Sequence, residues 1–212
     1  MLINEIFQSI QGESTYAGLP CVFVRFGGCN LACSWCDTPY AQTTFGARDL
    51  AVDEVMAEVK KYRCGLVEIT GGEPLMQEEA EELAAALLDA GCRVLIETNG
   101  SISLEGIDRR AIKVVDVKCP SSGFAGAFLV ENIGFITKDD EVKFVIADMA
   151  DYEFAKRFIE EYLRDATQKV LFAPVSPGLP PKTLAEWILK DGLSVRLQLQ
   201  MHKYVWGNER GR

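Results

Sequence analysis

Short apolar runs rich in β-branched residues alternate with amphipathic stretches along most of this sequence, and that alternation limits the folds open to the chain. Such runs are typical of buried strands, and the stretches between them carry apolar residues at helical spacing. Seven segments have this strand-like character: Cys21–Phe26, Leu66–Ile69, Val94–Ile96, Val114–Val117, Val142–Ile146, Val170–Phe172 and Val195–Leu199. Strands that alternate with helices predict an α/β fold with a parallel sheet covered by helices.

Three amphipathic helices are predicted between these runs. Their apolar stripes are Val52, Val55, Met56, Val59 and Tyr62; Ala80, Leu83, Ala84, Leu87 and Leu88; and Phe154, Phe158, Ile159 and Tyr162. Six or seven strands are too few for an eight-stranded barrel. Ligands of α/β sheets gather at the carboxyl ends of the strands, so the loops that follow the strands should carry the function.

The composition favours a single domain that acts on a small molecule. The chain has 212 residues, of which 48% are hydrophobic, and this is enough for one core. Since no linker divides the sequence, residues 1–212 are expected to form one domain. The sequence shows neither a secretion signal nor a membrane-spanning stretch, so we expect a cytoplasmic protein without a membrane partner. The net charge of −9 argues against direct nucleic-acid binding.

A cysteine-rich loop follows the first predicted strand. It spaces three thiols as C-x3-C-x2-C, with the cysteines at Cys29, Cys33 and Cys36. A structural zinc site or an electron-transfer cluster takes four protein ligands, whereas three thiolates on a [4Fe–4S] cluster leave one iron free to bind a small molecule. The alternative is a zinc-stabilised binding module in which Cys21, Cys64 or His202 completes a tetrahedral site.

A second motif, Thr70-Gly71-Gly72-Glu73-Pro74, follows the next predicted strand. Its glycines let the backbone approach a ligand, and Glu73 offers a carboxylate to a cation. On its own, this segment is better explained as a strand-to-helix turn in which Pro74 begins the helix. The segment Glu97-Thr98-Asn99-Gly100 ends the strand after that. It is either a ligand contact or a plain Asn-Gly turn, and the residues alone favour neither.

The cysteine loop resembles that of the radical S-adenosylmethionine (SAM) superfamily, whose pattern is C-x3-C-x-aromatic-C, with Trp35 at the aromatic position. The glycine-glycine-glutamate segment agrees in order and separation. The resemblance implies a [4Fe–4S] cluster on the three cysteines, whose open iron binds SAM and whose reduced form splits SAM to a 5′-deoxyadenosyl radical. It also implies a set of SAM-binding residues: Trp35, Gly71, Gly72, Glu73, Glu97, Asn99 and Ser121.

Further segments resemble the 7-carboxy-7-deazaguanine synthases of this superfamily. They are Gln8–Glu13, Phe23–Gly28, Asp37-Thr38 directly after Cys36, Asp116–Ser121 and Leu199–Lys203, so the resemblance extends over nearly the whole chain. Members convert 6-carboxy-5,6,7,8-tetrahydropterin to 7-carboxy-7-deazaguanine with loss of ammonia, on the route to queuosine, and regenerate SAM at each turnover. The resemblance implies that reaction, a partial (β6/α3) barrel with parallel strands, a homodimer, and a flavodoxin- or ferredoxin-like electron donor.

The resemblance also implies contacts to the pterin and to Mg²⁺. A pterin has a planar donor–acceptor edge that Gln11 and Glu13 can bind, and a carboxylate that Arg25 can hold with two hydrogen bonds. The Thr38 hydroxyl is the implied protein ligand of Mg²⁺. Gly12, Thr70 and His202 complete the expected substrate contacts. The plainer explanations are a surface ion pair for the arginine, solvated loop positions for Gln11 and Glu13, and a turn cap for the threonine.

A glycyl-radical activating enzyme is the alternative within the superfamily. Such an enzyme would use the same cluster and SAM but would abstract hydrogen from a partner protein. The set of Gln11, Glu13, Arg25 and Thr38 would then have no evident purpose, so the sequence favours pterin chemistry.

Overall fold

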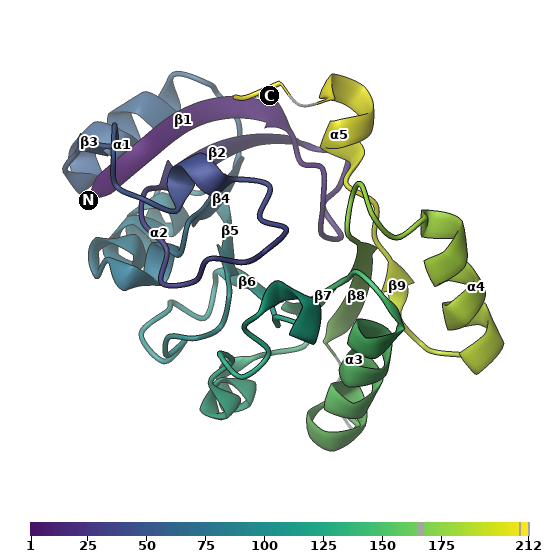
Figure 1. The fold of residues 1–212 in the computed structure, drawn as a ribbon. Helices are drawn as coiled ribbons and strands as arrows, with labels where there is room; N and C mark the ends of the chain where they lie inside the picture. Colours follow the sequence, from purple (N-terminus) through teal and green to yellow (C-terminus); the bar gives the residue numbers. More distant parts are fainter. Residues whose placement is uncertain (165–167, 208, 212) are drawn as a thin grey trace.

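One mixed sheet forms the centre of the computed structural model, which describes residues 1–164, 168–207 and 209–211 (Figure 1). Within those residues the strands are β1 (Leu2–Ile10), β2 (Pro20–Phe26), β3 (Arg48–Asp49), β4 (Leu66–Gly71), β5 (Arg93–Thr98), β6 (Ile112–Asp116), β7 (Glu141–Ile146), β8 (Lys169–Pro174) and β9 (Arg196–Leu197). Their spatial order is β3-β1-β2-β4-β5-β6-β7-β8-β9. Strand β1 is antiparallel to β2 and β3, and every other neighbouring pair is parallel.

Helices cover the outer face of this curved sheet (Figure 1). The α-helices are α1 (Val52–Lys60), α2 (Glu79–Asp89), α3 (Met149–Tyr162), α4 (Pro181–Asp191) and α5 (Met201–Trp206). Short 3-10 helices are η1 (Pro39–Ala41), η2 (Pro74–Met76), η3 (Pro120–Ser122) and η4 (Val130–Phe135). One apolar core lies under α1 and α2, and a second lies under α3 and α4. None of the described helices has the length and hydrophobicity needed to cross a membrane.

Successive residues of the parallel strands point to opposite faces of the sheet, and the two faces differ in character. On β2, Val24 and Phe26 belong to the outer core, whereas Arg25 lines a cavity on the inner face. On β4, Ile69 packs outward and Glu68 lines the same cavity. The inner face is therefore polar towards the carboxyl ends of the strands.

The opposite end of the inner face is apolar. A small core of Cys21, Phe23, Leu66 and Leu95 closes it, and Phe7 stacks on Phe23 with ring centroids 5.0 Å apart. Because this apolar end seals the sheet, solvent and ligands reach the inner face from the carboxyl ends of the strands.

The α/β fold with parallel strands is confirmed. Six parallel strands, β2 and β4 to β8, are joined in part by α1, α2 and α3, which agrees with a partial (β6/α3) barrel. All seven predicted strands are present, although the last is reduced to Arg196–Leu197. The sequence did not predict β1, whose apolar residues are interrupted by polar ones, or β3. It also did not predict α4, which follows the proline-rich segment 177–180.

Candidate functional site

The carboxyl ends of the parallel strands surround a cavity of about 220 Å³. Every residue that the sequence singles out for cluster, SAM, Mg²⁺ or substrate binding lines this cavity, except Glu73 and Ser121. The lining includes the loop after β1 at one end of the chain and His202 of α5 at the other. Residues nearly 200 positions apart in sequence thus meet at a single site.

The cysteine loop is anchored at both of its ends by residues outside the sheet. The backbone N–H of Cys29 donates to Gln42 O at 3.0 Å. At the other end, the Trp35 indole N–H donates to the Ser121 hydroxyl at 3.1 Å, and the Ser34 hydroxyl donates to Ser121 O at 2.6 Å. Ser121 therefore lies behind the loop and holds the aromatic residue, while Trp35 itself faces the cavity.

The three thiols are spaced more widely than the ligands of a single bound zinc ion. Tetrahedral zinc with Zn–S bonds of about 2.3 Å brings its sulfur ligands to about 3.8 Å from one another. Among the described residues, the sulfurs of Cys29, Cys33 and Cys36 do not all lie within 4.8 Å of one another. Of the three candidates for a fourth zinc ligand, Cys21 and Cys64 do not line the cavity, whereas His202 lines it beside Glu13 and Asp37. All three thiols line the cavity, as a cluster with one iron open to a ligand requires.

The two glycines of the second motif bring backbone close to backbone. A Cβ atom on Gly72 would lie 2.6 Å from Ala41 O and closer still to Gly28 O. Gly71 has φ of +142°, in the region that favours glycine. The Gly72 N–H donates to Phe26 O at 3.1 Å and so ties the end of β4 to the end of β2. No side chain fits here, and both glycines line the cavity.

Glu73 itself is turned away from the cavity and is fully buried. Its carboxylate accepts hydrogen bonds from Leu75 N–H at 3.1 Å, the Thr98 hydroxyl at 2.8 Å and Asn99 N–H at 2.7 Å. Burial raises the pKa of Glu73, although these hydrogen bonds oppose the rise. The carboxylate therefore ties the end of β4 to the end of β5.

Arg25 presents a free fork of donors to the cavity. Its Nε donates to Glu5 Oε1 at 2.8 Å, and among the described residues its terminal nitrogens make no hydrogen bond. Glu5 is itself fixed by the Tyr40 hydroxyl at 2.8 Å and by Arg210 Nε at 3.1 Å. Burial acts to lower the pKa of Arg25, but Tyr40 and Glu5 raise it overall. The guanidinium is thus oriented from behind and charged.

Gln11 and Glu68 form a buried pair on the cavity wall. The Gln11 amide nitrogen donates to a Glu68 carboxylate oxygen, and the Gln11 amide oxygen accepts from Glu13 N–H at 2.9 Å. Burial, followed by the neighbouring Glu97 and Glu13 carboxylates, raises the pKa of Glu68 well above its ordinary value. Gln11 is therefore held beside a carboxyl group that tends to keep its proton.

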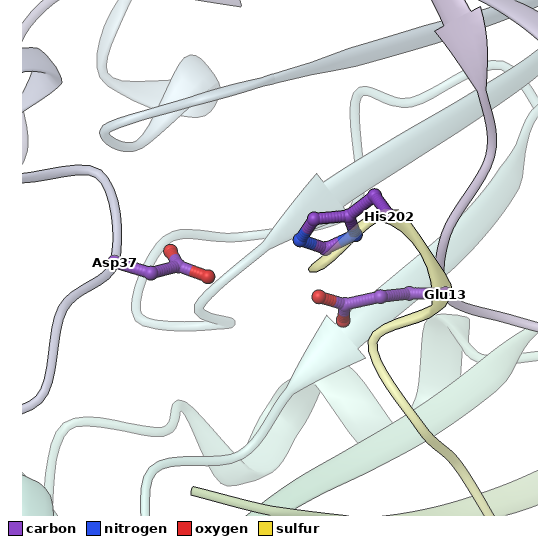
Figure 2. A group of neighbouring side chains, drawn as sticks. All are labelled: Glu13, Asp37 and His202. Atoms are coloured by element: carbon purple, nitrogen blue, oxygen red, sulfur yellow. The ribbon is translucent and has the colours of Figure 1, made fainter. Parts of the chain in front are cut away.

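Glu13, Asp37 and His202 converge from three distant segments, and their side chains point toward one another (Figure 2). One potential ligand atom from each lies within 4.8 Å of the other two. The Thr38 hydroxyl, the implied Mg²⁺ ligand, is adjacent and donates to Asp37 Oδ1 at 3.0 Å. Carboxylate and hydroxyl oxygens are the protein ligands that Mg²⁺ prefers, so this corner of the cavity fits that ion.

Two lysines neutralise the acids of this corner. Lys143 Nζ lies 2.9 Å from Glu13, and Lys203 Nζ lies 3.3 Å from Asp37. The Gln200 amide bridges the two carboxylates at 2.9 and 3.1 Å. Burial acts to raise the pKa of Asp37, but Lys203 and the other donors bring it down to about 2. Burial likewise acts to raise the pKa of Glu13, and Lys143 lowers it overall.

Comparison with known proteins identifies the family. Residues 23–189 match the description of the radical SAM superfamily. The 7-carboxy-7-deazaguanine synthase of Koribacter versatilis is 47% identical over 99% of this chain and 98% of its own length. That of Chlorobaculum tepidum is 42% identical over 96% and 93%. The chain belongs to the 7-carboxy-7-deazaguanine synthase family. Members of this family use a [4Fe–4S] cluster and SAM as cofactors. The comparisons therefore favour a synthase over the glycyl-radical activating enzyme and over the zinc-stabilised binding module.

A solved structure agrees on the fold of this synthase-family chain. QueE from Escherichia coli superposes with a TM-score of 0.79 over 95% of this chain and 94% of that one, at 22% sequence identity. At that identity the likeness concerns the fold alone. It supports the partial barrel.

Sequence reasoning missed several charged residues of the site in this synthase-family chain. Glu68, Asp116 and Lys143 lie on the inner face of the strands and line the cavity, as does Lys118 just after β6. A signal was present, because a charged residue interrupts otherwise apolar strands at Glu68 and Lys143. Since such residues are rarely fully buried unless paired, each one marks a polar pocket inside the sheet.

Proposed function

We propose that this chain converts 6-carboxy-5,6,7,8-tetrahydropterin to 7-carboxy-7-deazaguanine with loss of ammonia, in the biosynthesis of queuosine or related deazapurines. The observation that carries the proposal is the single cavity that gathers the three cluster cysteines, the Gly71-Gly72 backbone and the substrate residues of both chain ends. The full-length similarity to named synthases supports the same conclusion.

The cluster and SAM, when bound, supply the radical that takes a hydrogen from the substrate. Cys29, Cys33 and Cys36 would hold three irons, and the cavity in front of them leaves room for SAM. The backbone at Gly71 and Gly72 would bind the methionyl amino group. Glu97 and Asn99 line the wall beyond and would bind the ribose. Tight confinement of both reactants favours reaction between them over release of SAM fragments.

Three side chains would bind the pterin. The free fork of Arg25 would hold the carboxylate with two hydrogen bonds, because its Nε is already occupied by Glu5. The ionised Glu13 accepts hydrogen bonds and suits the amino-bearing edge of the ring. Gln11 lies beside it and offers both a donor and an acceptor, once released from Glu68.

Thr38 would bind Mg²⁺ with its hydroxyl, with Asp37 as a further oxygen ligand or as a partner of bound water. His202 lies opposite, where its imidazole can contact the substrate carboxylate side of the cavity. In this arrangement Mg²⁺ would screen the negative charges of the substrate and of the two acids.

Other features of the protein belong to the same proposal. The chain would act in the cytoplasm as one domain and as a homodimer, and would receive electrons from a flavodoxin- or ferredoxin-like protein.

The decisive experiment is anaerobic reconstitution with iron and sulfide, followed by incubation with reductant, SAM, Mg²⁺ and the carboxytetrahydropterin. Mass spectrometry should then detect the deazaguanine acid. Reactions that lack SAM, and a Cys33→Ser variant, should give none. Formation of 5′-deoxyadenosine only when a protein partner is added, with no deazaguanine product, would contradict the proposal.

A further inference from the structure

Lys143 lies on the inner face of β7 and touches carboxylates from three other segments. Its ammonium is 2.9 Å from Glu13 and 3.5 Å from Asp116, and it also donates to Glu97. The Lys143 side chain is only 5% exposed. A buried ammonium with three acidic neighbours is held in one place, because both desolvation and attraction oppose its movement away from them.

Two of these carboxylates are proposed to contact different ligands. Glu13, on the loop after β1, is the proposed contact of the pterin edge, and Glu97, at the end of β5, is the proposed contact of the SAM ribose. We infer that Lys143 is a positioning residue that fixes Glu13 and Glu97 together, so that the pterin and SAM are bound in one geometry. This inference rests on the proposed function.

Two other cations near the glutamates are already engaged. Lys118 pairs with Asp116 at 2.8 Å, and the Nε of Arg25 is bound to Glu5. The remaining partners of the two glutamates are neutral. Glu97 accepts from the Thr70 hydroxyl at 3.2 Å, and Glu13 accepts from the Gln200 amide at 2.9 Å.

Loss of Lys143 would therefore leave two half-buried carboxylates, Glu13 and Glu97, beside the buried Glu68 without an ammonium between them. Like charges in a buried site either take up a proton or move apart. Either response spoils a contact, because a protonated or rotated Glu13 no longer accepts the pterin's hydrogens at the same angle. A displacement of about 1 Å in a reacting pair can lower the rate by about 100-fold.

The chain contains a matched control for a buried lysine. Lys113 on β6 pairs with Asp140 at 3.0 Å, and its side chain is 3% exposed. Lys113 does not line the cavity. A purely structural role for Lys143 would make the two lysines equivalent in their effect on ligand binding.

The test compares Lys143→Met with Lys113→Met in the reconstituted holoenzyme at equal iron content. For Lys143→Met we expect higher KM values for both pterin and SAM, and a fall in kcat/KM for the pterin of about 100-fold. We also expect more 5′-deoxyadenosine per molecule of deazaguanine, because SAM is cleaved without a correctly placed substrate. Lys113→Met should keep wild-type KM values and the wild-type product ratio.

Two polar variants cover the case in which Lys143→Met does not fold. Lys143→Arg keeps the charge and should retain most of the wild-type coupling, whereas Lys143→Gln should show the raised KM values. Unchanged KM values and product ratio in both Met and Gln variants would overturn the inference, as would equal behaviour of the Arg and Gln variants. A wild-type enzyme that forms no deazaguanine would instead refute the proposed function, so the two failures are distinguishable.

Discussion

Gly12 lies directly beneath the imidazole of His202, so that a Cβ atom at position 12 would fall 2.7 Å from His202 Cγ and closer still to Nδ1. The backbone makes the same connection, since Met201 N–H donates to Gly12 O at 2.9 Å. The loop after β1 and the start of α5 therefore pack as one unit along the cavity. Glycine is required at position 12 because a side chain would collide with His202. Its backbone conformation does not require glycine, because its φ lies outside the left-handed region.

Substitution Gly12→Ala should displace His202 from the cavity wall. The added methyl group meets a side chain, which can rotate, so the fold and the cluster should survive. We expect KM for the pterin to rise by about tenfold, a loss of about 1.4 kcal/mol in binding. Steady-state kinetics on the reconstituted enzyme would measure this. Gly126→Ala, where no atom lies within 4 Å of the added Cβ, should behave as wild type; equal KM values in both variants would contradict the packing role.

Substitution Arg25→Lys should remove the fork of donors while keeping the positive charge. A lysine ammonium cannot serve Glu5 and both oxygens of a substrate carboxylate in one plane. We expect kcat/KM for the pterin to fall by about 10- to 100-fold, the equivalent of a charged hydrogen bond of about 1.5–3 kcal/mol. SAM binding, followed through its effect on the cluster spectrum, should be unchanged. An Arg25→Lys enzyme with wild-type kcat/KM would show that the fork is not used.

The buried Glu68 predicts a dependence of stability on pH. Its pKa is raised in the folded protein by burial and by Glu97 and Glu13. A raised carboxyl pKa stabilises the fold fully below the ordinary value of 4.5, and this contribution is lost as the pH rises through the raised pKa. One such group gives a slope of at most about 1.4 kcal/mol per pH unit.

Glu68→Gln replaces the protonated carboxyl with a neutral amide that cannot titrate. The variant should therefore gain thermal stability relative to wild type as the pH rises above the ordinary carboxyl range and through the raised pKa of Glu68. Melting temperatures of the two holoenzymes across that range would measure the difference. A constant gap between the two curves would mean that Glu68 does not titrate there.

The sequence predicted most of the site because its motifs directly follow strands. The cysteine loop follows β2 and the glycine pair lies at the end of β4, and the carboxyl ends of parallel strands meet at one edge of a sheet. Those two placements were sufficient to bring Cys29, Gly71 and Gly72 to the same cavity. Gln11 and His202 needed the family resemblance, since nothing local to either residue indicates that the chain ends meet.

The contacts inside the site could not be predicted, because they depend on partners far apart in sequence. Glu73 offered a carboxylate to a ligand, but Asn99 and Thr98 of the next strand take it up. Lys143 lies in a mostly apolar strand, and the sequence pattern around it does not indicate what its side chain contacts. Its function depends on Glu13, 130 residues away, and becomes visible only in the folded chain.

Mössbauer spectroscopy of the ⁵⁷Fe-reconstituted protein, with and without SAM, tests the central claim that Cys29, Cys33 and Cys36 hold a cluster with one open iron. The account predicts that SAM changes the signal of one iron in four and leaves the other three nearly unaltered. Four irons that are all indifferent to SAM, or a protein that binds one zinc ion and no cluster, would contradict it.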